Sequence, residues 1–131
     1  MSATTNSERS GTKRVLLVDA HDLFREVLGM VLERHAGFDK SVHASSLVEA
    51  RRALDDQLGE GDLVVVDLDL PGGLYLLEEL RQAAPGVPVL GIIANGDRGP
   101  LARALEAGAS EVLVLNASGE EIVAAARRLA G

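Results

Sequence analysis

The sequence predicts an α/β fold, a doubly wound three-layer sandwich made of five βα units. From Arg14 onward, short runs rich in valine, isoleucine and leucine alternate with longer stretches whose apolar residues recur at helical spacing. Three of the short runs are almost continuously apolar, which is typical of parallel strands covered by helices on both faces. A chain of 131 residues has room for one such domain.

The expected strands are short and rich in aliphatic residues, many of them β-branched. The three nearly continuous apolar runs contain Val15, Leu63 and Val89. The five strands are expected at Arg14 to Val18, Lys40 to Ala44, Leu63 to Val66, Val87 to Ile93 and Glu111 to Leu115.

A helix is expected after each strand, because apolar residues recur there three and four positions apart. The first helix is expected around Phe24, Val27, Leu28 and Val31. The other four are expected around Leu47, Ala50, Leu54 and Leu58; Leu76, Leu77 and Leu80; Leu101, Ala104 and Leu105; and Ile122, Ala125 and Leu129. Gly37 and Gly108 stand where helices should end, and Ser118 with Glu121 forms a capping box for the last helix.

The composition excludes several classes of function. The formal net charge of −7 disfavours direct binding of this domain to DNA or to an anionic membrane. The chain has no cysteine, so disulfides, thiolate metal sites and thiol nucleophiles are excluded, and a cytoplasmic location is expected. No apolar run is long enough to span a membrane. We expect residues 1–12 to be a disordered polar tail that precedes a single domain at residues 13–131.

Two acidic residues leave apolar strands at the same edge of the predicted sheet. Asp19 follows the first strand and Asp67 follows the third. In a flavodoxin-like sheet of order 2-1-3-4-5 these strands are neighbours, so the two carboxylates would face one another in the crevice at the carboxyl ends. Like charges placed in this way repel, which favours a divalent cation, with Mg²⁺ the obvious candidate.

Three segments occur in order along this pattern: Val15 to Glu26, Asp67 to Gly72, and Ala104 to Ala109. Together they resemble the receiver domain of two-component response regulators, particularly the NarL/LuxR type, and the resemblance extends over almost everything from Lys13 onward. It implies a signalling domain rather than an enzyme, which takes part in a phosphorelay with a sensor histidine kinase. Regulators of this type carry a helix-turn-helix domain after the receiver. We therefore expect transcriptional regulation through a DNA-binding domain absent from this sequence.

The resemblance implies roles for three acids. Asp67 corresponds to the aspartate that accepts a phosphoryl group from the phosphohistidine of the kinase. Asp19 and Asp67 correspond to metal-binding acids, and Asp69 corresponds to the residue whose backbone carbonyl completes the protein ligands of Mg²⁺. A carboxylate nucleophile needs no general base, so positioning and charge neutralisation carry such a transfer.

Four positions depart from the family pattern. Ala20 replaces the second adjacent acid, so Mg²⁺ should bind weakly. Ile93 stands at the strand-four hydroxyl position, Leu115 at the strand-five lysine position and Val112 at the aromatic switch position. Hydrogen bonds to charged groups contribute about 1.5–3 kcal/mol each, whereas inverting a two-state equilibrium needs about 5.5 kcal/mol. The sequence therefore predicts a degenerate receiver that keeps the acceptor but responds weakly to phosphate.

Simpler interpretations of single residues remain open. Asp19 is also suited to capping the turn that follows it, and Asp69 to a turn before Pro71. Asp22 is expected to cap or begin the first helix, and the alternative is that it replaces the missing acid. We expect His21 to be a solvent-side loop residue rather than a ligand.

Two other functions remain open at this point. The first is an interaction or homodimerisation module that works without phosphorylation, through Leu23, Met30 and Leu32 of the first helix or through the small residues Ala124, Ala125 and Ala126 of the last. The second, remote, is a cobalamin-binding module, because Asp19-Ala20-His21 begins an Asp-x-His-x-x-Gly signature. Its sixth position is Phe24 instead of glycine. A bulky ring there would block close approach of the cofactor.

Overall fold

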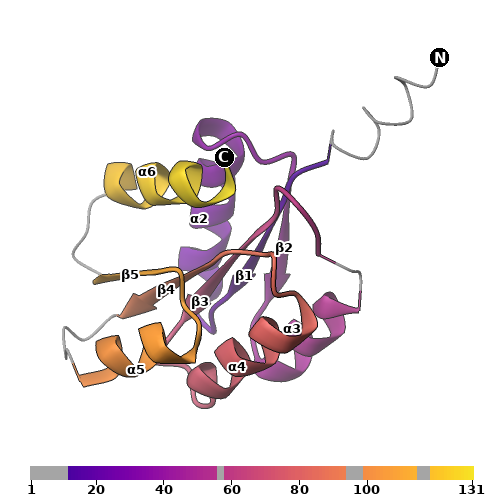
Figure 1. The fold of residues 1–131 in the computed structure, drawn as a ribbon. Helices are drawn as coiled ribbons and strands as arrows, with labels where there is room; N and C mark the ends of the chain where they lie inside the picture. Colours follow the sequence, from indigo (N-terminus) through magenta and orange to yellow (C-terminus); the bar gives the residue numbers. More distant parts are fainter. Residues whose placement is uncertain (1–11, 56–57, 94–98, 115–118) are drawn as a thin grey trace.

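The structure is a computed structural model that describes residues 12–55, 58–93, 99–114 and 119–131. Within these ranges, five strands alternate with five helices along the chain (Figure 1). Leu115, the capping residue Ser118 and residues 1–11 of the expected tail lie outside the described residues.

The strands form one parallel sheet in the predicted order, β2-β1-β3-β4-β5. They are β1 (Arg14–Val18), β2 (Lys40–Ala44), β3 (Leu63–Asp67), β4 (Val89–Ile93) and β5 (Glu111–Val114). The prediction that β4 begins at Val87 is wrong, because the Val87 N–H closes a turn with Ala84 and Pro88 has no N–H to donate to a neighbouring strand. Strand β3 extends one residue further than predicted, so Asp67 itself pairs with Ile92 of β4.

Helices cover both faces of the sheet, which confirms the three-layer sandwich. The helices α2 (Asp22–His35) and α6 (Gly119–Ala130) lie on one face, and α3 (Leu47–Leu54), α4 (Gly73–Ala83) and α5 (Gly99–Ala107) lie on the other (Figure 1). Leu58, expected in α3, follows its end, because the Asp55 N–H bonds to the carbonyl of Arg52 three residues back and tightens the last turn. None of the helices described is long and apolar enough to cross a membrane.

The buried side of α2 is rotated relative to the prediction. It consists of Arg25, Leu28, Gly29 and Leu32, which also follow helical spacing. Val27, expected in the core, is 50% exposed, and Leu32, expected on the outer surface, is fully buried. The difference arises because Arg25, a charged residue, occupies an inward position at the start of the helix.

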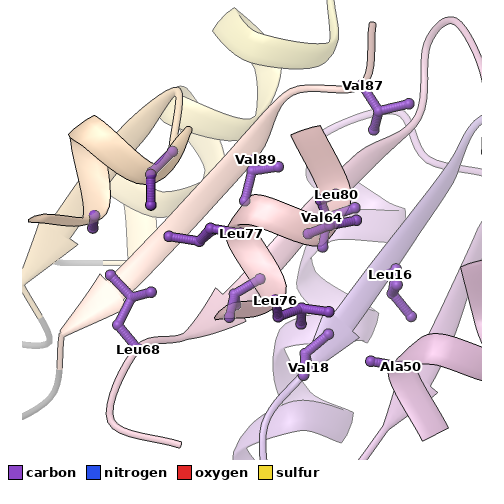
Figure 2. Close-up of a cluster of buried hydrophobic side chains, with 14 of the residues drawn as sticks. Leu16, Val18, Ala50, Val64, Leu68, Leu76, Leu77, Leu80, Val87 and Val89 are labelled. Carbon is purple, nitrogen blue, oxygen red and sulfur yellow. The ribbon is translucent and has the colours of Figure 1, made fainter. Parts of the chain in front are cut away.

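Alternate residues of each strand pack into two separate apolar clusters. On β1, Val15 and Leu17 face α2 and α6, whereas Leu16 and Val18 face α3 and α4. Figure 2 shows the second cluster, in which strand side chains pack against a row of leucines on α4: Leu76, Leu77 and Leu80. A slip of one residue in any strand would reverse this pattern. The register is therefore firmly specified, and it aligns the carboxyl ends of β1 and β3.

Candidate functional site

Asp19 and Asp67 meet at the carboxyl edge of the sheet. Val18 pairs with Val66 in the ladder between β1 and β3, so the residues that follow each of them stand side by side. A carboxylate oxygen of Asp19, a carboxylate oxygen of Asp67 and a ring nitrogen of His21 all lie within 4.8 Å of one another. The two acids that the sequence predicted to face one another are thus brought together, and His21 joins them.

Asp67, the last residue of β3, is only 7% exposed. Its Oδ1 accepts a hydrogen bond of 2.9 Å from the backbone N–H of Asp69. Burial raises the pKa of Asp67, and the charges of Asp19 and Asp69 raise it further, against the lowering effects of the Asp69 N–H and of His21. The ionised form of Asp67 is therefore less favourable in the protein than in water, and a nearby cation would relieve this penalty.

Asp19 has two functions in the structure. It is 8% exposed, and its Oδ1 accepts hydrogen bonds from the backbone N–H of His21 at 2.7 Å and from Nδ1 of the His21 ring at 2.8 Å. The first bond closes the turn between β1 and α2, as the simpler interpretation predicted. The same side chain also faces Asp67. Turn capping and participation in the acidic cluster are therefore compatible.

The prediction for His21 holds only in part. Its side chain is 74% exposed, as expected of a loop residue, but its ring turns back toward the acids instead of into solvent. The hydrogen bond to Asp19, together with the negative charge of Asp19, raises the pKa of His21. The signal for this contact was its position two residues after Asp19, at the spacing that a side chain needs to reach back across a turn.

Asp69 lies beside the cluster and not within it. Its backbone N–H orients the Asp67 carboxylate, and the turn that follows is closed by a bond from the Leu70 N–H to the carbonyl of Asp67. Gly72 then adopts a φ of +83° just before α4, and a Cβ on Gly73 would lie 3.2 Å from the carbonyl oxygen of Asp67. Small residues therefore allow α4 to begin close beneath the site.

Arg25 is the site residue that the sequence interpretation missed. It is 8% exposed, and its Nη1 donates a 2.6 Å hydrogen bond to the backbone carbonyl of Asp19. Its Nη2 contacts a carboxylate oxygen of Asp22 at 2.9 Å, and its Nε lies 3.1 Å from Nδ1 of His43 on β2. Arg25 thus ties α2 to the ends of β1 and β2 and holds the backbone of Asp19 in place.

Asp22 begins α2, as predicted, and its carboxylate pairs with Arg25. It is not a member of the cluster formed by Asp19, His21 and Asp67. Within the described part of the chain, Asp22 therefore does not take the place of the acid that Ala20 lacks.

Two described residues of β4 and β5 that stand at departed family positions are apolar. Ile93 is 1% exposed and belongs to the core cluster on the α4 face, and Val112 is half-buried against that cluster. Ala20, by contrast, is exposed. The side chains of Ile93 and Val112 cannot donate a hydrogen bond to an anion. Leu115, the fourth departed position, lies outside the described residues.

Comparison with known proteins decides the family. The family model of the response regulator receiver domain matches residues 15–127. The chain belongs to this family. Receiver domains are signalling domains, and this assignment leaves the cobalamin interpretation without support.

Two curated relatives from Pseudomonas putida are activators by name. The glycerol metabolism activator is 34% identical over 99 residues, which are 73% of this chain and 44% of that protein. The transcriptional activator protein ExaE is 35% identical over 117 residues, which are 88% of this chain and 54% of that protein. The chain spans about half the length of these curated relatives.

A solved structure supports the same assignment. A putative response regulator from Chloroflexus aurantiacus is 30% identical, with a TM-score of 0.78 over 90% of this chain and 97% of that one. The family and the flavodoxin-like fold are thereby confirmed. The NarL/LuxR subtype, the degenerate site and the domain boundary after residue 12 remain predictions.

Proposed function

We propose that this receiver accepts a phosphoryl group on Asp67 from a sensor histidine kinase, but responds to it only weakly. The observation that carries the proposal is the contrast within one edge of the sheet. Two buried carboxylates face one another at its β1 and β3 end, whereas Ile93 and Val112 offer no polar group at the other.

The chemistry of the donor set fits the Mg²⁺ that the family implies. Asp19 and Asp67 are both nine-tenths buried and lie close enough to repel, and burial and repulsion raise the pKa of Asp67. Carboxylate and carbonyl oxygens are the ligands that Mg²⁺ prefers. Asp19, Asp67 and the backbone carbonyl of Asp69 would hold the ion. When bound, Mg²⁺ supplies positive charge that offsets the charge of the incoming phosphate.

The residues around Asp67 position the nucleophile. The Asp69 N–H holds Oδ1, so the carboxyl group cannot rotate freely. In the transfer, a carboxylate oxygen of Asp67 forms a bond to phosphorus while the bond from phosphorus to the kinase imidazole nitrogen breaks. No proton has to be removed from the nucleophile once Asp67 is ionised. Arg25 contributes indirectly, because it fixes the backbone of Asp19.

The weak response follows from the missing donors. A hydroxyl on β4 and an ammonium on β5 would each bond to a phosphoryl oxygen, with about 1.5–3 kcal/mol per bond. Ile93 provides no such bond, and the sequence places leucine at position 115. Phosphorylation should therefore stabilise an altered conformation only slightly over the resting one. We expect only a small shift of population between the two conformations.

The test is incubation of the chain with a small phosphodonor and Mg²⁺. We expect a mass gain of one phosphoryl group in the wild type and none in Asp67→Asn. We also expect the amide NMR spectrum away from the site to change little upon labelling. Absence of labelling at Asp67 would contradict the acceptor role, and a large spectral change across α5 and β5 would contradict the weak response.

A second candidate function is phosphorylation-independent contact with a partner or with a second copy of the chain. Leu23 and Met30, predicted for such a face, are 77% and 53% exposed and share one side of α2 with Val27. On α6, in contrast, Ala125 and Ala126 are buried and belong to the core. Light scattering with and without phosphodonor would separate a constitutive dimer from a monomer. The kinase partner and the cytoplasmic location remain predictions.

A further inference from the structure

The imidazole of His21 has no role in the function proposed above, yet it lies in the same site. Its Nδ1 is 2.8 Å from Oδ1 of Asp19. A ring nitrogen of His21 and one carboxylate oxygen from each of Asp19 and Asp67 lie within 4.8 Å of one another. The donor set around Asp67 is thus a mixed set of oxygen and nitrogen atoms.

The three donors approach from different elements and leave one side open. Asp67 ends β3 and Asp19 follows β1, and both are buried, whereas His21 approaches from the solvent side at the start of α2. Solvent-side positions therefore remain for water or a phosphoryl oxygen. Three protein ligands with open positions are typical of metal sites that bind a further molecule.

The distances are compatible with a single ion. Ligand atoms about 2.1 Å from a Zn²⁺ ion stand about 3.4 Å apart at tetrahedral angles. The present separations do not exceed 4.8 Å, so contraction by about 1.4 Å at most completes the set. His21 is the donor best able to move, because its side chain is 74% exposed.

An independent observation indicates that Asp67 is available to such a ligand. It is nine-tenths buried, and the hydrogen bond that it accepts from Asp69 goes to Oδ1. Among the residues that the structure describes, no hydrogen bond is made to its Oδ2. A carboxylate oxygen that receives no hydrogen bond from these residues is well suited to a cation.

We propose that His21 is a nitrogen ligand in this site and takes the place of the acid that Ala20 lacks. The site then favours divalent transition ions such as Co²⁺, Ni²⁺ or Zn²⁺ by more than an all-oxygen receiver site would. Imidazole nitrogen binds these ions well, whereas Mg²⁺ prefers oxygen ligands and keeps its waters. The inference deepens the proposed function, since it concerns the same pocket.

The decisive quantity is the dependence of each affinity on His21, because any site with nitrogen and oxygen donors binds transition ions more tightly than Mg²⁺. We would titrate the full chain with Co²⁺ and follow its visible absorption, and titrate it with Mg²⁺ and follow amide NMR shifts. The variant is His21→Gln, which keeps a polar side chain at the start of α2. The matched control is His35→Gln, an exposed histidine at the other end of the same helix.

In His21→Gln we expect the Co²⁺ affinity to fall by about ten-fold or more, and the Mg²⁺ affinity by less than about three-fold. His35→Gln should match the wild type for both ions. The ring ¹⁵N shifts of the wild type with Zn²⁺ should show metal coordination at His21 only. Equal loss of both affinities, an unchanged Co²⁺ affinity in His21→Gln, or a Zn²⁺ shift at another histidine would overturn the inference.

These measurements are independent of phosphorylation. A wild-type chain that binds Co²⁺ through His21 but gains no phosphoryl mass would retain the metal inference and lose the acceptor role. A chain that is labelled at Asp67 but whose Co²⁺ affinity ignores His21 would do the reverse.

Discussion

The two ends of the carboxyl edge are built in the same way and carry opposite chemistry. At β1 and β3, apolar strands end in buried carboxylates, with His21 and Arg25 holding the loop around them. On β4 and β5, the described residues at the departed family positions are aliphatic, with Ile93 inside the core and Val112 against it. The proposed function therefore predicts that accepting a phosphoryl group and responding to it depend on separate sets of residues, of which this chain keeps only the first.

The largest change in stability is expected on removal of Arg25, which holds the loop after β1 at the acidic end of the edge. Replacing Arg25 by Met should lower the free energy of unfolding by about 2–4 kcal/mol, because the carbonyl of Asp19 loses a charge-assisted bond and stays buried. The ion pair with the exposed Asp22 contributes little to this figure. Urea unfolding measures the change, with Arg34→Met on the exposed side of α2 as the control. Equal stability of the two variants would show that the polar end needs no such anchor.

The next prediction concerns a substitution that adds a polar group to β4. Ile93→Thr restores a hydroxyl on β4, so phosphorylation should then raise the free energy of unfolding by about 1.5–3 kcal/mol more than it does in the wild type. Ile93→Val keeps the site apolar and should show no such gain. The measurement is urea unfolding with and without excess phosphodonor. A threonine variant that behaves as the valine variant does would break the comparison, because the missing hydroxyl would not be what limits the response.

A smaller effect on stability is expected from the burial of the Asp67 carboxylate. The pKa of Asp67 is raised above its ordinary value of 3.8, mainly by burial. Its protonated form therefore stabilises the fold below that pH, and the contribution is lost as the pH rises through the folded-state pKa. Asp67→Asn should consequently be more stable than the wild type at neutral pH without metal, with a difference that shrinks on acidification. Thermal unfolding of both proteins from neutral to acidic pH measures this difference. A variant less stable than the wild type at neutral pH would contradict the prediction.

The smallest effect belongs to His21. Its pKa is raised above the ordinary value of 6.5 by the hydrogen bond to Asp19 and by the charge of that carboxylate. The stabilising contribution of the pair is therefore complete below that pH and is lost as the pH rises through the folded-state pKa. The deficit in stability of His21→Gln should be visible in mildly acidic buffer and vanish in alkaline buffer. A deficit that grows with pH would show that the ring is not held by Asp19.

Most of the fold was predictable, because the strands are continuous apolar runs in a regular alternation with helices. The sheet order and the meeting of Asp19 with Asp67 followed from that pattern and from the geometry of parallel sheets. The start of β4 could not be predicted, because Val87 is apolar and precedes a proline, a pattern that resembles a strand whether or not the residue pairs with a neighbouring strand.

Two residues of the site could not be predicted for a different reason. A charged residue on a helix is normally solvated, so nothing in the pattern marked Arg25 as buried. A histidine in a loop normally faces water, and the spacing of His21 from Asp19 allows the ring to fold back on that carboxylate without requiring it. In both cases the deciding contact is made by a long or mobile side chain, whose direction hydrophobic periodicity does not encode.

The most direct test of the account is an amide NMR comparison of the wild-type chain before and after phosphorylation at Asp67 with Mg²⁺. We expect complete labelling, with shifts confined to the loops after β1 and β3 and the start of α4. Shifts of similar size across β4, α5 and β5 would contradict the account, because the apolar end would then respond as strongly as the polar one.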